Sequence, residues 1–288
     1  MLHFYYRSAE GNFGDDLNPW LWARAAPGLL TGEIVAESCC PNDDVFVGIG
    51  SLFGLRLPVG RSLHFFSTGY AYFAPPEIQA NWHVYCVRGP LTASALGLHS
   101  DTAIADGALL LSRYFDPAVP GHARRTPSFM PHHSTAEFYG TAWRDACASV
   151  GIEFIDPRAE TEVILGQLAR SSLVIAEAMH GAIVADVLGV PWVRVVTEHD
   201  RHEFKWQDWA QSVGVELKTF TLAVAGQYLR RRPGLQALVV RRAGPRALRM
   251  VLAKATPQLS DRRTLTSVTD RLEDAFGDML REIQRPNC

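Results

Sequence analysis

The sequence predicts an α/β protein with two Rossmann-like lobes and a helical tail. Short apolar segments alternate with amphipathic ones along most of the chain, which is typical of mostly parallel sheets covered by helices. Residues 116–127, rich in proline, glycine and arginine, separate two such runs and resemble a linker. We therefore expect an N-terminal lobe at 1–118, a C-terminal lobe at 119–225 and peripheral helices at 226–288.

Each lobe is expected to contain four strands, recognised as short apolar runs that end at a glycine or a polar turn. In the first lobe they are residues 2–6, 44–48, 63–66 and 83–87, and in the second lobe 128–131, 153–155, 173–176 and 192–196. Helices are expected at 17–26, 90–96, 137–150, 160–169 and 180–188. The helix that begins at Pro90 has proline in its first turn and Gly97 as its stop, both favoured positions.

The tail differs from the lobes because it has arginine-rich helical segments and no strand pattern. Arg230-Arg231-Arg232 and Arg241-Arg242 are its densest basic runs. Such runs form a solvated face in most proteins. The alternative is peripheral contact with the anionic face of the cytoplasmic membrane.

Composition excludes several classes of protein. The formal net charge is −2, so no strong field favours nucleic acid, and we expect no nucleic-acid partner. The N-terminal segment lacks the basic region and long apolar run of a signal peptide. No stretch approaches the roughly 18 apolar residues that a membrane span needs. We therefore expect a cytoplasmic protein.

Cysteines and histidines do not form a metal-binding pattern. The five cysteines are odd in number, Cys39 and Cys40 are adjacent, and there is no C-x-x-C pair, which favours reduced thiols. His199 and His202 are closely spaced, but no H-E-x-x-H motif is present. We predict no metal ion.

Polar and glycine-rich clusters follow five of the expected strands. They are Gly14-Asp15-Asp16, Gly48-Ile49-Gly50-Ser51, Val87-Arg88-Gly89-Pro90, Pro131-His132-His133 and Glu177-Ala178-Met179-His180-Gly181. Functional residues of open α/β sheets gather at the carboxyl ends of strands. We therefore expect these clusters to line one cleft between the two lobes.

His180 is the sharpest catalytic candidate. It lies where an apolar strand gives way to a helix, and Gly181 lets a ligand approach the backbone closely. A helix N-terminus favours an anion, and histidine transfers protons near neutral pH. The alternative is a structural histidine at the end of a helix. Glu177 either orients the imidazole or deprotonates a hydroxyl, or it is only a favourable first-turn acid.

The loop Asn12-Phe13-Gly14-Asp15-Asp16-Leu17-Asn18 offers carboxylates and amides that suit sugar hydroxyls. Its alternative role is to cap the following helix. Arg88, at the end of a strand, and Lys205, between aromatic residues, are candidate ligands for a phosphate or carboxylate. A surface arginine and a lysine with its charged end in solvent are the respective alternatives.

Six segments in this order resemble the polysaccharide pyruvyl transferase family, and most of all its bacterial exopolysaccharide branch with the succinoglycan-type enzymes. They are residues 13–21 (FGDDLNPWL), 47–52 (VGIGSL), 87–93 (VRGPLTA), 129–133 (FMPHH), 176–186 (AEAMHGAIVAD) and 204–210 (FKWQDWA). Together they cover about residues 1–220.

The resemblance implies a glycosyltransferase-B-like fold with its site between two lobes. It also implies transfer of the pyruvyl group of phosphoenolpyruvate to two hydroxyls of a sugar, which forms a cyclic ketal. The acceptor in this family is often a lipid-linked oligosaccharide, and no cofactor is implied beyond the donor substrate. We expect His180, Glu177 and Asp16 to carry the acid–base steps. Residues expected to bind substrate are Arg88, Lys205, Asn18, Gly50, Ser51, His132, His133, Met179 and Gly181.

Two departures from the family pattern leave other functions open. Many members have arginine two residues before the histidine, where this chain has Ala178, and their Asp-Pro pair is Asp106-Gly107 here. Donor binding then depends on other cations, of which Arg88 and Lys205 are the candidates. The alternatives are a glycosyltransferase that uses a nucleotide sugar on the same fold, and a non-catalytic relative.

Overall fold

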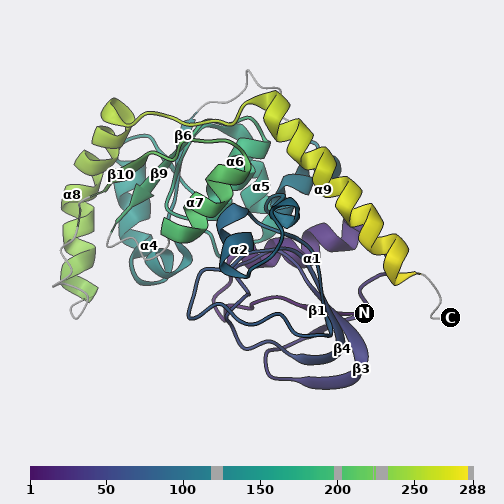
Figure 1. Cartoon of the computed structure of the whole chain (residues 1–288). Helices are drawn as coiled ribbons and strands as arrows, with labels where there is room; N and C mark the ends of the chain where they lie inside the picture. Colours follow the sequence, from purple (N-terminus) through teal and green to yellow (C-terminus); the bar gives the residue numbers. More distant parts are fainter. Residues whose placement is uncertain (118–125, 198–202, 223, 225–232, 285–288) are drawn as a thin grey trace.

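Two parallel sheets form the centre of the molecule, as the sequence predicts. The computed structural model describes residues 1–117, 126–197, 203–222, 224 and 233–284. In that part of the chain each sheet has five strands, in the orders β2-β1-β3-β4-β5 and β10-β9-β8-β6-β7, and every pairing is parallel. Helices lie around and between the sheets (Figure 1). The predicted α/β class with two Rossmann-like lobes and C-terminal helices is therefore confirmed.

The first sheet contains the four expected strands and one more. Its strands are β1 (Leu2–Phe4), β2 (Gly32–Ile34), β3 (Cys39–Val47), β4 (Val59–Thr68) and β5 (Trp82–Val87). The helical segments of this lobe are α1 (Phe13–Ala25), α2 (Pro90–Ala95), the short turns Ser100–Thr102 and Gly107–Leu110, and α3 (Leu111–Tyr114).

The second sheet likewise contains the expected strands and an additional edge strand. Its strands are β6 (Thr126–Met130), β7 (Glu153–Phe154), β8 (Ser171–Ala176), β9 (Trp192–Val196) and β10 (Thr219–Thr221). Its helices are α4 (His133–Ala148), α5 (Thr161–Arg170), α6 (Met179–Val187) and α7 (Glu203–Ser212).

Two helices begin earlier than predicted, and both corrections concern site residues. Helix α1 starts at Phe13 rather than at residue 17, because Asp16 Oδ2 accepts a hydrogen bond from the N–H of Asn12 (2.9 Å) at the start of the helix. Helix α4 starts at His133 rather than at residue 137, because the His132 side chain accepts a hydrogen bond from the Ser134 N–H. Segments expected to be loops are thus the first turns of helices.

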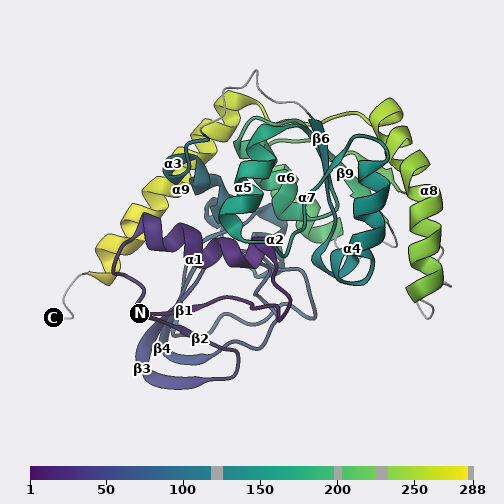
Figure 2. The same cartoon turned by 180° about the vertical axis from the view of Figure 1, so that it is seen from behind.

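The two C-terminal helices lie on opposite edges of the molecule (Figures 1 and 2). Helix α8 (Pro233–Lys254) packs against α4 in the second lobe. Helix α9 (Arg262–Ile283) returns to the first lobe and packs against β5, and its Phe276 ring contacts the rings of Trp22 and Phe66. Helix α9 therefore contributes to the core of a lobe that begins at the other end of the chain.

A single apolar cluster joins the two lobes. It includes Leu17 and Leu21 of α1 together with Leu165 of α5 and Ile183 of α6, all fully buried. The Phe13 N–H also donates a hydrogen bond to the carbonyl oxygen of Pro157 across the boundary (2.8 Å). These contacts hold the strand ends of one sheet against those of the other.

Candidate functional site

The structure brings the predicted clusters together at the boundary between the lobes. Helix α1 follows β1, α6 follows β8, and both place their first turns at this boundary, as expected for carboxyl ends of parallel strands. His180 of α6 lies directly over Gly14 of α1, where an added Cβ atom would stand 2.1 Å from its Nδ1 atom. Glycine at position 14 is therefore what allows the imidazole into this place.

His180 also faces a buried carboxylate that the sequence analysis did not assign. Its Nε2 atom lies 3.5 Å from Oδ2 of Asp106, which has no exposed surface. Neither of these two atoms has a hydrogen-bond partner among the described residues. The other oxygen of Asp106 accepts a hydrogen bond from the Ala108 N–H (3.0 Å), which fixes the carboxylate. The imidazole and the carboxylate thus form a buried pair with unused hydrogen-bonding capacity.

Electrostatics keep the Asp106 carboxylate charged. Burial alone would raise its pKa, but the attraction of His180, and then of Arg88, outweighs burial and lowers the pKa of Asp106 below its usual value. His180 is therefore placed to act as a proton donor.

Lys205 of α7 is a partly buried cation without an ion pair in the described part of the chain. Burial first, and then repulsion by Arg88, lower the pKa of Lys205 to about 8, against the attraction of Asp15. An ammonium group that is desolvated but unpaired gains most from an anionic ligand. Of the two predicted anion-binding cations, Arg88 is paired with Asp208, whereas Lys205 has no counter-charge within hydrogen-bonding distance among the described residues.

Of the two neighbouring acids on α1, Asp15 faces the catalytic candidates. Burial raises the pKa of Asp15 to about 6, opposed by its hydrogen bond with Asn12 and by the charges of His180 and Lys205. Asp16, our predicted base, instead holds the N-terminus of α1, and burial raises its pKa as well. Asp15 is thus a further candidate base, and the role of Asp16 as a base stays a prediction.

Each nitrogen of the Arg88 guanidinium donates a hydrogen bond within the protein. Its side chain is fully buried, and its Nε atom donates to Oδ2 of Asp208 on α7 (3.1 Å). Its two terminal nitrogens donate to Oγ of Ser51 (2.7 Å) and to the carbonyl oxygen of Tyr70 (2.8 Å). The guanidinium lies over Gly69, where an added Cβ would stand 2.1 Å from its central carbon. Arg88 thereby ties the first lobe to α7, and its predicted role as an anion ligand stays a prediction.

Asn18 and Gly50 support the loop after β3. The Asn18 amide is fully buried; its oxygen accepts from the N–H of Ile49 (2.8 Å), and its nitrogen donates to the carbonyl oxygens of Ile49 (2.9 Å) and Asp15 (3.0 Å). The carbonyl of Asp15 is available because Pro19, four residues later, has no N–H. Gly50 has a φ of +135°, a backbone conformation that favours glycine. Direct contact of these residues with substrate stays a prediction.

Glu177 joins three strand ends of the second sheet. One of its carboxylate oxygens accepts from the N–H of His132 after β6 (2.9 Å), and the other accepts from the hydroxyl of Thr197 after β9. His132 in turn begins α4, and its ring lies 4.3 Å from that of His133. Burial and the charge of Lys205 lower the pKa of His133, which places this imidazole near the unpaired cation.

The last two predicted residues shape the start of α6. Met179 is buried, and Gly181 lies so close to Met130 that an added Cβ would stand 2.7 Å from its sulfur. Tyr72, which the sequence analysis did not select, belongs to the same cluster: burial raises its pKa, and Asp15 and Arg88 interact with it electrostatically. Nothing in the local sequence distinguishes Tyr72 from other loop tyrosines.

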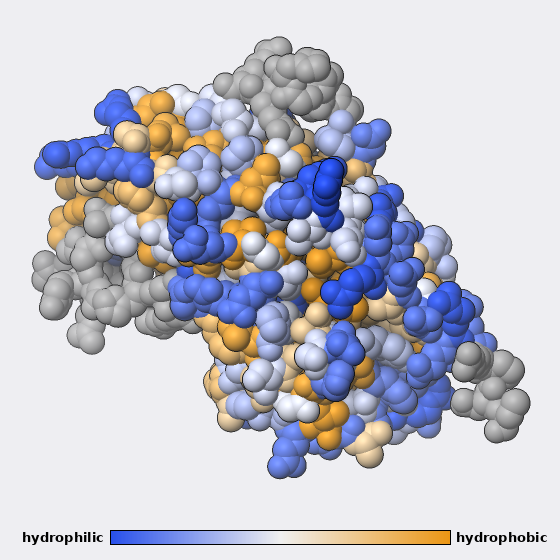
Figure 3. Space-filling model, turned by 45° about the horizontal axis from the view of Figure 1, so that its top comes forward, coloured by the Kyte–Doolittle hydropathy of each residue, from blue (hydrophilic) through white to orange (hydrophobic). Residues whose placement is uncertain are grey.

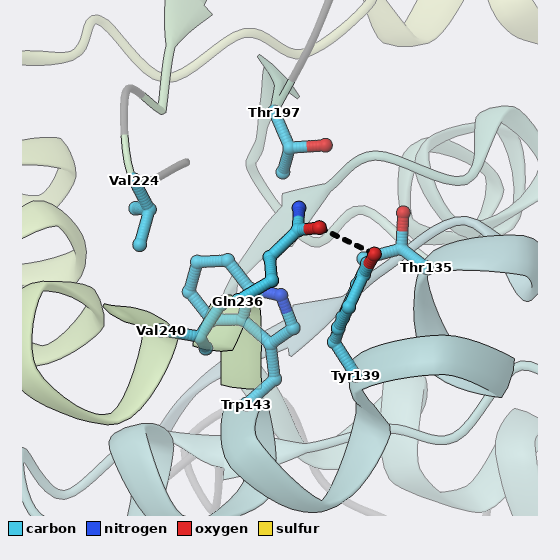
Figure 4. A pocket seen from close by; sticks show the side chains of 7 residues that line it. All are labelled: Thr135, Tyr139, Trp143, Thr197, Val224, Gln236 and Val240. Atoms are coloured by element: carbon cyan, nitrogen blue, oxygen red, sulfur yellow. Dashed lines mark hydrogen bonds between the residues drawn. The ribbon is translucent and has the colours of Figure 1, made fainter. Parts of the chain in front are cut away.

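A small cavity whose lining includes Thr197 is not the predicted cleft. Figure 4 shows it between α4, α8 and the end of β9, with Tyr139 donating a hydrogen bond to Oε1 of Gln236 (2.5 Å). Its volume is about 30 Å³, roughly the space that one water molecule occupies. It is therefore too small for a sugar or a phosphate ester.

The described residues contain neither a cluster of metal ligands nor a membrane-spanning helix. Among these, no three histidine, cysteine, aspartate or glutamate side chains stand close enough together to hold a metal ion. His199 and His202 lie outside the described residues. No helix within the described ranges has the length and apolar character to span a bilayer.

The chain is similar to a curated protein of known pathway. The chain is 36% identical over 219 residues to the succinoglycan biosynthesis protein ExoV of Rhizobium meliloti (strain 1021). The alignment covers 75% of this chain and 66% of the relative, which is just under two-thirds of its length. No family model matches the chain. The protein is thus a homologue of an exopolysaccharide-biosynthesis protein.

Proposed function

We propose that this homologue of a succinoglycan biosynthesis protein is a pyruvyl transferase, which moves the pyruvyl group of phosphoenolpyruvate onto a sugar residue of an exopolysaccharide precursor. The observation that carries the proposal is that the pair of His180 and Asp106 and the cation Lys205 meet at one residue: the charges of His180 and of Lys205 both act on Asp15. A proton donor and an anion ligand in one site are what this reaction needs. We place the reaction in the cytoplasm.

The donor carries a phosphate and a carboxylate, and both require cations or N–H groups. Lys205 supplies the charge, and the N-terminus of α6, which begins at Met179, supplies N–H groups and the positive end of the helix dipole. Ala178, where many members of the family have arginine, precedes that helix and leaves no cation there. Lys205 therefore takes over the role of the absent arginine, with His133 beside it.

The chemistry follows from these positions. His180 gives a proton to the methylene carbon of the donor, and the positive charge that develops at C2 is attacked by the first sugar hydroxyl. Asp15, with a pKa of about 6, accepts the proton of that hydroxyl. The bond from C2 to the phosphate oxygen then breaks, and the second hydroxyl attacks C2 to close the ketal. The two sugar hydroxyls release two protons in all. One of them returns to His180, which gave its proton to the new methyl group, and the other leaves with inorganic phosphate.

The test is incubation of the protein with phosphoenolpyruvate and a panel of lipid-linked and synthetic glycosides. Release of phosphate together with a product heavier by one pyruvyl ketal supports the proposal. Thermal stabilisation by a nucleotide sugar and not by phosphoenolpyruvate would instead support a glycosyltransferase. Binding of neither donor, with no turnover on any glycoside, would favour a non-catalytic relative.

A further inference from the structure

Helix α8 has two faces of opposite character. One face, with Val240, Leu248 and Val251, is buried against the second lobe. On the opposite side of the helix five exposed residues form what we call the outer face of α8: Leu235, Leu238, Arg242, Arg246 and Arg249. Their spacing of three or four residues places them along one stripe.

The charge of this helix is all of one sign. Its sequence, PGLQALVVRRAGPRALRMVLAK, has five basic residues and no acidic residue. Arg241 pairs with Asp145 of α4. The three arginines of the outer face have no ion pair within the described part of the chain. Their positive charge is therefore directed to solvent without compensation.

Apolar side chains are exposed among these arginines. Leu235 and Leu238 are each 43% exposed, and Met250 and Leu252, at the C-terminal end of the helix, are each 40% exposed. In the space-filling view, apolar and hydrophilic residues alternate along the edge of the molecule where α8 lies (Figure 3). Helix α9 differs, because its exposed arginines alternate with acids such as Asp270 and Glu273, which pair with Arg113.

We propose that the outer face of α8 docks on the surface of an anionic phospholipid bilayer. Arginines attract negatively charged headgroups, and leucine and methionine side chains enter the boundary between headgroups and acyl chains. A nucleic acid would use the arginines but would leave the exposed leucines in water. The mixture of unpaired cations and exposed aliphatic side chains on one stripe therefore fits a bilayer. Binding to vesicles needs no substrate, so this inference is independent of the proposed reaction.

The experiment is flotation of the full chain with vesicles of equal parts phosphatidylcholine and phosphatidylglycerol, compared with vesicles of phosphatidylcholine alone. The wild-type protein should bind only the anionic vesicles. A triple variant, Arg242→Gln, Arg246→Gln and Arg249→Gln, should bind at least about tenfold more weakly, since each basic residue near an anionic surface contributes to attraction. A double variant, Leu235→Ser and Leu238→Ser, should also bind more weakly.

The matched control removes three exposed arginines of α9, with Arg263→Gln, Arg271→Gln and Arg281→Gln, and should bind as the wild-type protein does. Thermal unfolding of all variants verifies that they are folded. If the control variant lost vesicle binding to the same extent, net charge alone would explain the effect and the proposal would be overturned. Unchanged binding in the leucine variant would exclude insertion and overturn it as well. A dimer in solution that the leucine variant abolishes would assign the face to a second copy of the chain instead.

Discussion

Two buried pairs of ionisable side chains at the boundary between the lobes differ in how completely they are hydrogen-bonded. The carboxylate of Asp208 accepts hydrogen bonds from Arg88 and from both the N–H and the hydroxyl of Thr92. In the pair of His180 and Asp106, the facing atoms are 3.5 Å apart and have no hydrogen-bond partner among the described residues. A buried polar atom without a partner costs about 1–3 kcal/mol. The pair of Arg88 and Asp208 therefore supports the fold, whereas the facing atoms of His180 and Asp106 can still form hydrogen bonds with a ligand.

Replacement of His180 by alanine should have the largest effect on activity. Loss of the proton donor is expected to lower kcat by about 100- to 10,000-fold, the usual contribution of a general acid. Phosphate release from phosphoenolpyruvate in the presence of an active glycoside measures it. His99→Ala, which removes an exposed histidine, is the control and should leave kcat unchanged. If the His180→Ala protein transferred the pyruvyl group at the wild-type rate, this site would have no part in the mechanism.

Replacement of Asp208 by alanine should have the largest effect on stability. Arg88 would then be buried without a counter-charge, which is expected to lower the free energy of unfolding by about 3–5 kcal/mol. Urea denaturation followed by circular dichroism measures it, with the exposed Asp101→Ala as control. The double variant Arg88→Met, Asp208→Leu should recover much of the loss. If Asp208→Ala were as stable as the control, the pair would not hold the lobes together.

Lys205→Met should weaken binding of the donor and should also change how the stability of the protein depends on pH. Without the cation, the Kd for phosphoenolpyruvate is expected to rise about 10- to 100-fold, as for the loss of a charged hydrogen bond. The folded pKa of Lys205, about 8, lies below its unfolded value. Wild-type stability should therefore rise between about pH 8 and pH 10, and the variant should lack this rise because it has no amine to titrate.

Calorimetric titration of the donor, and unfolding at both pH values, measure these two effects. The control is Lys218→Met, which removes an exposed lysine and should change neither quantity. If Lys205→Met bound phosphoenolpyruvate as tightly as the wild-type protein does, groups other than Lys205 would bind the phosphate.

Asp106→Asn should have the smallest effect of the four, because it keeps the shape of the side chain and removes only its charge. We expect kcat to fall by about tenfold, and the variant to lose the part of the acid-side pH dependence that protonation of Asp106, whose pKa is lowered, contributes in the wild-type protein. A merely structural role would lower stability without moving the pH profile. The pH dependence of kcat for both proteins therefore separates a positioning role from a structural one.

The sequence predicts the sheets well because their strands are apolar runs with local signals at each end. The strands β2 and β10 were missed since Gly32–Ile34 and Thr219–Thr221 have only three residues and no apolar run. The start of α1 was missed because Asn12 and Asp16 suit a loop and a helix N-terminus equally well. Tertiary contacts decide between these two structures.

The location of the site was predictable, but the pairing of its charges was not. Strand ends indicate where polar clusters gather, and His180 was selected on that basis. Asp106 and Asp208 each act through a partner far away in sequence, and no local pattern indicates such a partner. For the same reason, Arg88 looked like a free anion ligand in the sequence and has three protein partners in the structure.

The return of α9 to the first lobe has a consequence for the order in which the protein matures during synthesis. The first lobe is made before α9, so Trp22 and Phe66 gain their neighbour Phe276 only after the second lobe has been synthesised. Until then an aromatic surface of a nearly finished sheet is open to solvent and to other nascent chains. The core of the first lobe is thus completed only after the second lobe has been made.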